Sequence, residues 1–201
     1  ERPWEACMTL NHSPGWGNIR HSIADKTAGD VLYNFMEAVR LGGNFLFNIG
    51  PDAKGQVTPR DRDALDRIGK WLEVHGEAVY GMYPGDIYTG PTQGPVFQYG
   101  MFTSKENIAY LTIFYYPGDY LIISKLGPAI RKATMMCTGQ ELTVEAMKNA
   151  RWKISGLPET PPCDLAPVIK IEFEAPPYLL THTDGRWLDG TYEATALPHS
   201  T

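Results

Sequence analysis

The stretch GGNFLFNIGPD, residues 42–52, decides how the first half of this 201-residue chain folds. It holds a short and mostly apolar run, residues 44–49, between a glycine pair and a Gly-Pro-Asp turn signal. A short apolar run bounded by turn residues predicts a β-strand. A strand of this kind between two helices is covered on both faces and pairs in parallel. We therefore expect residues 44–49 to form a buried parallel strand.

Helical patterns flank this strand on both sides. Residues 30–41 carry apolar side chains at helical spacing, with Thr27 or Asp25 as the candidate N-cap. Residues 58–75 begin with a Thr-Pro pair, which is typical of a helix start, and the pattern ends at a glycine. The order helix, strand, helix is typical of a barrel or a doubly wound sheet. With only one clear strand, residues 1–83 read as the tail of a larger α/β domain.

The pattern changes to short β segments from residue 84 onward. Turn signals separate six such segments, which are residues 96–102, 108–115, 120–124, 133–137, 151–154 and 168–173. Several short alternating strands are typical of an antiparallel β-sandwich. The predicted fold class is therefore α/β plus all-β, with an α/β part over residues 1–83, a β-sandwich over residues 84–180 and an irregular tail over residues 181–201.

Composition and absent motifs exclude several functions. The net charge is −5 and the basic residues do not cluster, so we expect no nucleic-acid partner. No apolar run approaches the roughly 18 residues of a membrane-spanning helix, so we expect no membrane contact. Motifs for phosphate loops, zinc proteases and serine hydrolases are missing, and we expect neither a metal nor a cofactor.

Three cysteines, Cys7, Cys137 and Cys163, are present. An odd count without zinc-like spacing argues against a disulfide framework and against a metal site. At most one pair could form a bridge, and we favour free buried thiols.

The opening stretch ERPWEACMTLNHSPGWGN, residues 1–18, carries the best candidates for chemistry. Glu5 follows Trp4, and a carboxyl group beside an indole ring in a water-poor cleft keeps its proton, as a general acid must. Trp16 lies between two glycines, and the apolar face of a sugar stacks on such a ring. The alternatives are a surface carboxylate for Glu5 and a packing role for Trp16.

Four ordered motifs resemble the α-L-fucosidases of glycoside hydrolase family 29. They are W-E-A-C-M-T at 4–9 with W-G at 16–17, the strand motif at 42–52, I-G-K-W-L at 68–72 and G-E-A-V-Y-G at 76–81. The resemblance covers residues 1 to about 84 strongly, and the family also carries a C-terminal β-sandwich. It implies the tail of a (β/α)8-like barrel followed by that sandwich. It also implies hydrolysis of terminal α-linked L-fucose, with retention of configuration, from fucosylated oligosaccharides or glycoconjugates.

The resemblance also implies roles for single residues. Glu5 matches the general acid/base, with Glu1 and Asp25 as alternates, because this residue varies in the family. Trp16, Trp4 and Asn48 would bind the substrate. Asn48, together with Asp52, would lie at the carboxyl end of the last barrel strand, with turn hydrogen bonding as the alternative role.

Two positions depart from the family pattern. Asn18 replaces the usual tyrosine after Trp-Gly, which removes an aromatic neighbour. His75 replaces the usual asparagine before Gly-Glu-Ala, which we interpret as a variation at a helix end.

The family's aspartate nucleophile and most of its barrel strands have no counterpart in this sequence. We therefore expect a C-terminal fragment that is inactive alone, whose opening stretch is a catalytic loop and whose partner is the missing N-terminal part of the barrel. The strand at 45–49 would then expose two unpaired edges. Family habit predicts an extracellular, periplasmic or lysosomal protein, possibly a homo-oligomer. Two other functions stay open: a carbohydrate-binding or scaffolding β-sandwich without catalysis, and a glycosidase of another specificity.

Overall fold

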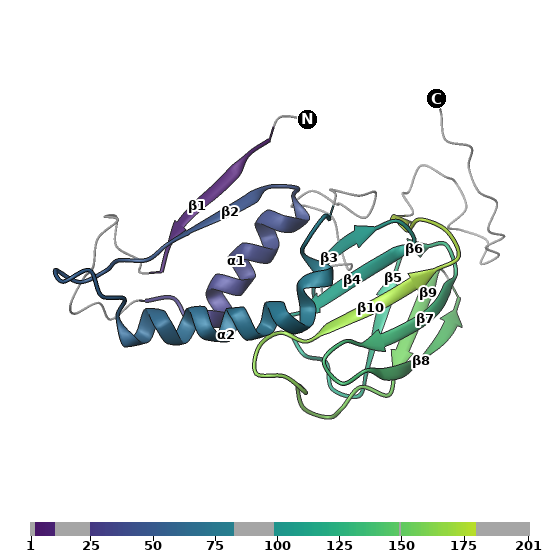
Figure 1. Ribbon diagram of the computed structural model, residues 1–201. Coiled ribbons are helices and arrows are strands. Elements are labelled where there is room, and N and C mark those ends of the chain that lie inside the picture. Colours follow the sequence, from purple (N-terminus) through teal and green to yellow (C-terminus); the bar gives the residue numbers. More distant parts are fainter. Residues whose placement is uncertain (1–2, 11–24, 83–98, 149, 180–201) are drawn as a thin grey trace.

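The computed structural model describes residues 3–10, 25–82, 99–148 and 150–179 (Figure 1). An antiparallel sheet that curves like half a barrel makes up most of the described fold, and helices are few. The first half contains β1 (Glu5–Thr9), α1 (Ala28–Arg40), β2 (Asn44–Asn48), α2 (Pro59–His75) and the 3₁₀ turn η1 (Gly76–Ala78). The second half contains β3 (Gly100–Lys105), β4 (Ile108–Ile113), β5 (Tyr120–Ser124), β6 (Leu126–Gly127), β7 (Ile130–Met135), β8 (Gln140–Met147), β9 (Arg151–Ser155), β10 (Val168–Phe173) and β11 (Tyr178–Leu179).

Strands β1 and β2 form a parallel pair, which confirms the predicted parallel strand and corrects the expected loop. Glu5 lies opposite Asn44, and Thr9 lies opposite Asn48. We expected the opening stretch to be a catalytic loop because of its resemblance to the fucosidase family. Pairing with β2 supplies the backbone hydrogen bonds that hold this polar segment extended. One edge of β2 is therefore paired, whereas the prediction left both edges open.

Only one face of the β1–β2 pair is covered by the residues that the structure describes. Phe45 and Phe47 point towards the helices, and the Phe45 ring lies 5.7 Å from that of Phe35 in α1. Leu46 points the other way and is 50% exposed. The prediction of a strand covered on both faces is thus met on the helix side alone.

Both helices begin where the sequence predicts, because their caps are local. Thr27 caps α1 through a capping box, in which its side chain accepts from the Asp30 N–H while the Asp30 carboxylate accepts from the Thr27 N–H. Thr58 caps α2 by accepting from the Asp61 N–H at 3.1 Å, with Pro59 at the first helical position.

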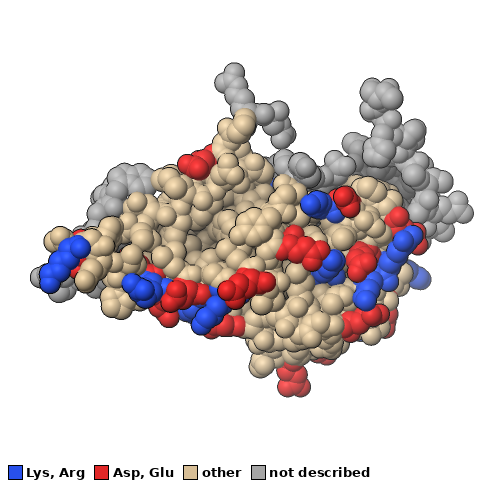
Figure 2. Space-filling view, in the orientation of Figure 1, with Lys and Arg blue, Asp and Glu red and all other residues tan. Residues whose placement is uncertain are grey.

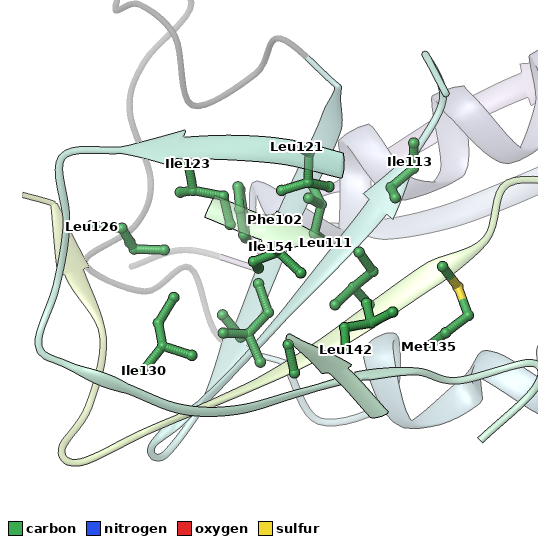
Figure 3. Packing of buried hydrophobic residues seen from close by; sticks show 14 of the residues in the cluster. Phe102, Leu111, Ile113, Leu121, Ile123, Leu126, Ile130, Met135, Leu142 and Ile154 are labelled. Atoms are coloured by element: carbon green, nitrogen blue, oxygen red, sulfur yellow. The ribbon is translucent and has the colours of Figure 1, made fainter. Parts of the chain in front are cut away.

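The second half is a seven-stranded antiparallel sheet that curls on itself. Its strand order is β3-β4-β10-β7-β8-β9-β5. The curled sheet forms two layers, and strand β8 belongs to both. Its residues 140–142 pair with β7, whereas residues 143–147 pair with β9. Buried side chains of both layers, including Leu111, Leu121 and Ile154, meet between them and form the β-sandwich core (Figure 3).

A second core joins the helices to the outer face of this sheet. It contains Leu32 and Met36 of α1, Trp71 of α2, and Tyr110 and Val168 of the sheet. Strand β4 is therefore buried on both faces, between the sandwich core and the helices, whereas Lys170 and Glu172 of β10 stay partly exposed on the outer face. The first and second halves thus share apolar packing.

A polar contact beside this core fixes η1 on the sheet. The Glu77 Oε1 atom accepts from the Tyr110 hydroxyl at 2.7 Å and from the Lys170 Nζ at 2.6 Å. These two donors hold the pKa of Glu77 below its ordinary value. Burial and the neighbouring carboxylate raise the pKa of Tyr110.

The structure corrects the prediction for two cysteines. Cys137 and Cys163 form a disulfide across 26 residues, while Cys7 is free and exposed. The pairing was invisible in the sequence because Cys137 follows β7 and Cys163 lies in the loop before β10, and only the fold brings these segments together.

Candidate active site

The face of the β1–β2 pair turned away from the helices carries three rows of side chains. Residues opposite each other in a parallel pair point to the same side, so the rows follow from the register. Glu5 and Asn44 form the row at the amino ends, Cys7 and Leu46 form the middle row, and Thr9 and Asn48 form the row at the carboxyl ends. The outer rows are polar and surround a less polar middle row.

Thr9 and Asn48 bring two polar side chains together where both strands end. Directly after this row, the Leu10 N–H donates to the Asn48 carbonyl at 3.1 Å. The side chain of Lys26 also contacts this row, because its Nζ donates to the Thr9 carbonyl at 2.7 Å. The predicted substrate-binding residue Asn48 therefore lies at a polar edge, which we call the carboxyl edge.

Glu5 lies at the opposite end of the same face. Its row is four positions along the strands from that of Asn48, which corresponds to about 13 Å. The Glu5 side chain is exposed. The structure therefore does not bring the predicted general acid and the predicted substrate-binding Asn48 together.

Trp4 packs near that amino end. Its indole N–H donates to the Leu41 carbonyl at 3.3 Å, and its ring lies directly over Gly43. This arrangement gives Trp4 a structural role in the turn that starts β2.

Two other predicted residues, Trp16 and Glu1, lie outside the described residues. The described chain reaches Leu10 and resumes at Asp25. Both flanks lie at the carboxyl edge, since the Lys26 N–H donates to the Leu10 carbonyl at 3.0 Å. The described residues on either side of residues 11–24 therefore lie together at this edge.

Asp25, the alternate general acid, lies at the carboxyl edge and forms an ion pair with Arg60 in the first turn of α2. The Asp25 side chain is only 12% exposed, whereas that of Arg60 is 53% exposed. The second oxygen, Oδ1, is buried and accepts no hydrogen bond from the described residues. A partly buried carboxylate with a spare oxygen can position a nearby donor.

Asp52 belongs to the turn that follows β2. Its Oδ1 accepts from the Lys54 N–H at 2.8 Å and from the Gln56 N–H at 2.9 Å. These bonds confirm the alternative role in turn hydrogen bonding, which Asp side chains commonly play.

Sequence reasoning missed Thr9, Lys26 and Arg60. Thr9 could have been found by extending the alternation of Glu5 and Cys7 once β1 was recognised as a strand. Lys26 and Arg60 carry no such signal, because they reach the edge from the starts of two helices that only the fold places side by side.

Charged side chains of both signs lie along α2 and over the sheet, whereas the area between α2 and the β1–β2 pair is mostly uncharged (Figure 2). No described helix is both long enough and apolar enough to cross a membrane.

Comparisons with known proteins point to one family. A family model described as alpha-L-fucosidase matches residues 1–77. The tissue alpha-L-fucosidase of Bos taurus is 28% identical over 169 residues, which is 82% of this chain and 35% of the bovine one. The chain thus spans about a third of the length of that relative.

Solved structures extend the likeness to the fold. Alpha-L-fucosidase isoenzyme 1 from Paenibacillus thiaminolyticus superposes with a TM-score of 0.72 at 28% identity, over 86% of this chain and 40% of that one. A family 29 alpha-L-fucosidase from Bacteroides thetaiotaomicron gives 0.69 at 30% identity, over 85% and 38%. The matched region of both includes most of the helices and strands described above.

Proposed function

The chain corresponds to a portion of the α-L-fucosidases of glycoside hydrolase family 29, and from that premise we propose that it forms part of an enzyme that hydrolyses terminal α-linked L-fucose. The substrates would be fucosylated oligosaccharides or glycoconjugates. The observation that carries the proposal is the carboxyl edge, where two parallel strands bring Thr9 and Asn48 together.

The proposal assigns β1, α1, β2 and α2 to the end of a (β/α)8-like barrel. The face with three rows of side chains becomes the barrel interior, which in such barrels is filled by layers of side chains. Active sites of these barrels lie at the carboxyl ends of the strands. In this proposal Asn48 would hydrogen-bond sugar hydroxyls, and Trp16 would supply the stacking ring.

The mechanism that fits this assignment uses two carboxyl groups. In retaining glycosidases a carboxylate attacks the anomeric carbon while a carboxylic acid protonates the leaving oxygen, and the two groups lie about 5–5.5 Å apart. The Bacteroides enzyme was trapped as a covalent intermediate with 2-fluoro-fucosyl fluoride, in a variant with one glutamate replaced by glutamine. That result supports a covalent, retaining route for this chain's family.

Glu5 and Asp25 are the described candidates for the proton donor. Glu5 has an exposed carboxyl group but occupies the row farthest from the carboxyl edge. Asp25 lies at that edge, but Arg60 stabilises its charged form, which is the opposite of what a donor needs. Neither candidate therefore combines a place at the carboxyl edge with surroundings that keep a carboxyl group protonated, since Glu5 lies at the wrong end and Asp25 is paired with Arg60.

Leaving-group dependence separates these candidates. A 4-nitrophenolate leaves without protonation, whereas a sugar hydroxyl needs the acid. In the full-length protein that carries this sequence, loss of the donor should lower kcat/KM for a fucosyl disaccharide by about 10²–10⁴-fold and spare 4-nitrophenyl fucoside. We would compare Glu5→Gln and Asp25→Asn, with Asp61→Asn in the first turn of α2 as the control. Full-length protein that cleaves neither substrate would contradict the proposed function.

The β-sandwich serves as a scaffold in this proposal. Its outer face shares a core with α1 and α2, so it supports the elements that position the carboxyl edge. A separate carbohydrate-binding role has no equivalent supporting contact among the described residues.

The disulfide supports the proposed compartment. Disulfides persist in secreted, periplasmic and similar oxidising environments and are rare in reducing ones. The bond between Cys137 and Cys163 therefore favours an extracellular, periplasmic or lysosomal protein.

A further inference from the structure

A second cluster of reactive groups lies far from the carboxyl edge, where α2 ends against the sheet. A ring nitrogen of His75 and the sulfur atoms of Cys137 and Cys163 all lie within 4.8 Å of one another. His75 is buried, whereas both cysteines are partly exposed. The cluster therefore combines a buried histidine with two partly exposed cysteines.

The imidazole of His75 has one nitrogen without a partner. Its Nδ1 lies 3.1 Å from the Trp71 carbonyl, to which a ring N–H donates. The lone pair then resides on Nε2, which is buried and has no hydrogen-bond partner among the described residues. The His75 side chain is only 2% exposed. Burial of an acceptor nitrogen without a hydrogen-bond donor costs free energy of folding unless another group binds the lone pair.

One face of α2 holds the loop that carries Cys163. Arg67 forms a two-point contact with the Asp164 carboxylate, at 2.7 and 3.1 Å. One turn later, the Trp71 indole N–H donates to the Ala166 carbonyl at 2.6 Å. His75 follows after one more turn. These contacts hold Cys163 close to His75 independently of the disulfide.

We propose that His75, Cys137 and Cys163 bind a zinc ion when the Cys137–Cys163 disulfide is reduced, with water as the fourth ligand. Two sulfur atoms and one imidazole nitrogen are ligands that zinc prefers. Tetrahedral zinc with bonds of about 2.3 Å to sulfur separates two sulfur atoms by about 3.8 Å. The 6.7 Å between the two Cα atoms accommodates this spacing. The sequence argued against a metal site because no two of these residues are close in the chain.

The two forms interconvert by balanced steps. A thiol reductant gives two electrons and two protons to the disulfide, which becomes two thiols while the reductant is oxidised to its own disulfide. Zinc then displaces one proton from each thiol and binds two thiolates and the Nε2 lone pair. The backbone bond at Nδ1 fixes the tautomer, as is usual for zinc-bound histidines.

Equilibrium dialysis of the 201-residue chain against Zn²⁺ tests the proposal. The chain is reduced with a water-soluble phosphine, or kept oxidised, and Co²⁺ provides a thiolate-to-metal absorption band as a second readout. We expect one zinc per reduced chain, none at this site in the oxidised chain, and a cobalt band in the reduced chain only.

Matched variants identify the ligands. Cys7→Ser removes the exposed cysteine outside the cluster and should leave zinc affinity unchanged. Cys137→Ser and His75→Asn should each weaken zinc binding by at least about tenfold. Loss of a residue that only hydrogen-bonds to a metal ligand already costs that much affinity, so loss of a ligand should cost no less. His75→Asn restores the residue that the family pattern has here, so the fold should tolerate it.

Three results would overturn the proposal. They are equal zinc affinity in oxidised and reduced protein, unchanged affinity in His75→Asn, and a loss in Cys7→Ser as large as that in Cys137→Ser. If reduction unfolds the chain, measured by circular dichroism, added zinc should refold it. Failure to do so would also contradict the site.

Discussion

At the scale of single residues, Gly43 is the most tightly constrained position beside β2. A Cβ atom there would lie 2.4 Å from two ring atoms of Trp4. Gly43→Ala must therefore push the indole away from the Leu41 carbonyl or move the turn. We expect the free energy of unfolding to fall by about 1–3 kcal/mol, as for other overpacked sites, measured by urea denaturation.

Gly69 provides the matched control for this substitution. It lies in the exposed middle of α2, where a Cβ would meet nothing within 4 Å. Gly69→Ala should raise the free energy of unfolding by about 0.5–1 kcal/mol, because alanine favours the helix. The packing explanation for Gly43 fails if Gly43→Ala is equally harmless.

Residues that act on close neighbours in sequence could be predicted, and those that act across the fold could not. Thr27 and Thr58 cap helices through bonds to residues three positions away, so their roles can be read from the sequence. The Asp25–Arg60 pair joins residues 35 positions apart, and nothing local marks it. The same holds for the disulfide.

At the scale of elements, the capping box of α1 should control the stability of that helix. The Asp30 N–H donates to the Thr27 Oγ1 at 3.2 Å, and the Asp30 carboxylate accepts from Thr27. Thr27→Ala should lower the free energy of unfolding by about 1 kcal/mol in thermal denaturation, whereas Thr27→Ser keeps the oxygen and should cost little. Equal losses in both variants would argue against the cap.

Strands differ in how far the sequence predicts them. Strand β10 has the bounds expected from its alternation, because Ile169 and Ile171 are buried between the layers. Strand β8 was missed because most of its side chains are exposed and its ends pair with different neighbours. Strand β1 was missed because its identity depends on pairing with β2, which lies more than 30 residues away.

At the scale of the whole molecule, the core between the helices and the sheet should make both halves unfold together. Met36 of α1 is fully buried in this core beside Trp71, Tyr110 and Val168. Met36→Ala should lower the free energy of unfolding by about 2–5 kcal/mol, because it leaves a cavity that packed neighbours fill only in part. The rates of backbone hydrogen exchange show which elements this substitution destabilises.

If the core couples the halves, Met36→Ala should speed exchange in β4 and β10 as well as in α1 and α2, because all four elements contribute buried side chains to this core. Cooperative units exchange together when their shared packing is weakened. Leu65→Ala is the control, since Leu65 is an exposed leucine on α2 and its loss removes little packing. Faster exchange confined to α1 and α2, with β4 and β10 unchanged, would mean that packing against the helices does not stabilise the sandwich.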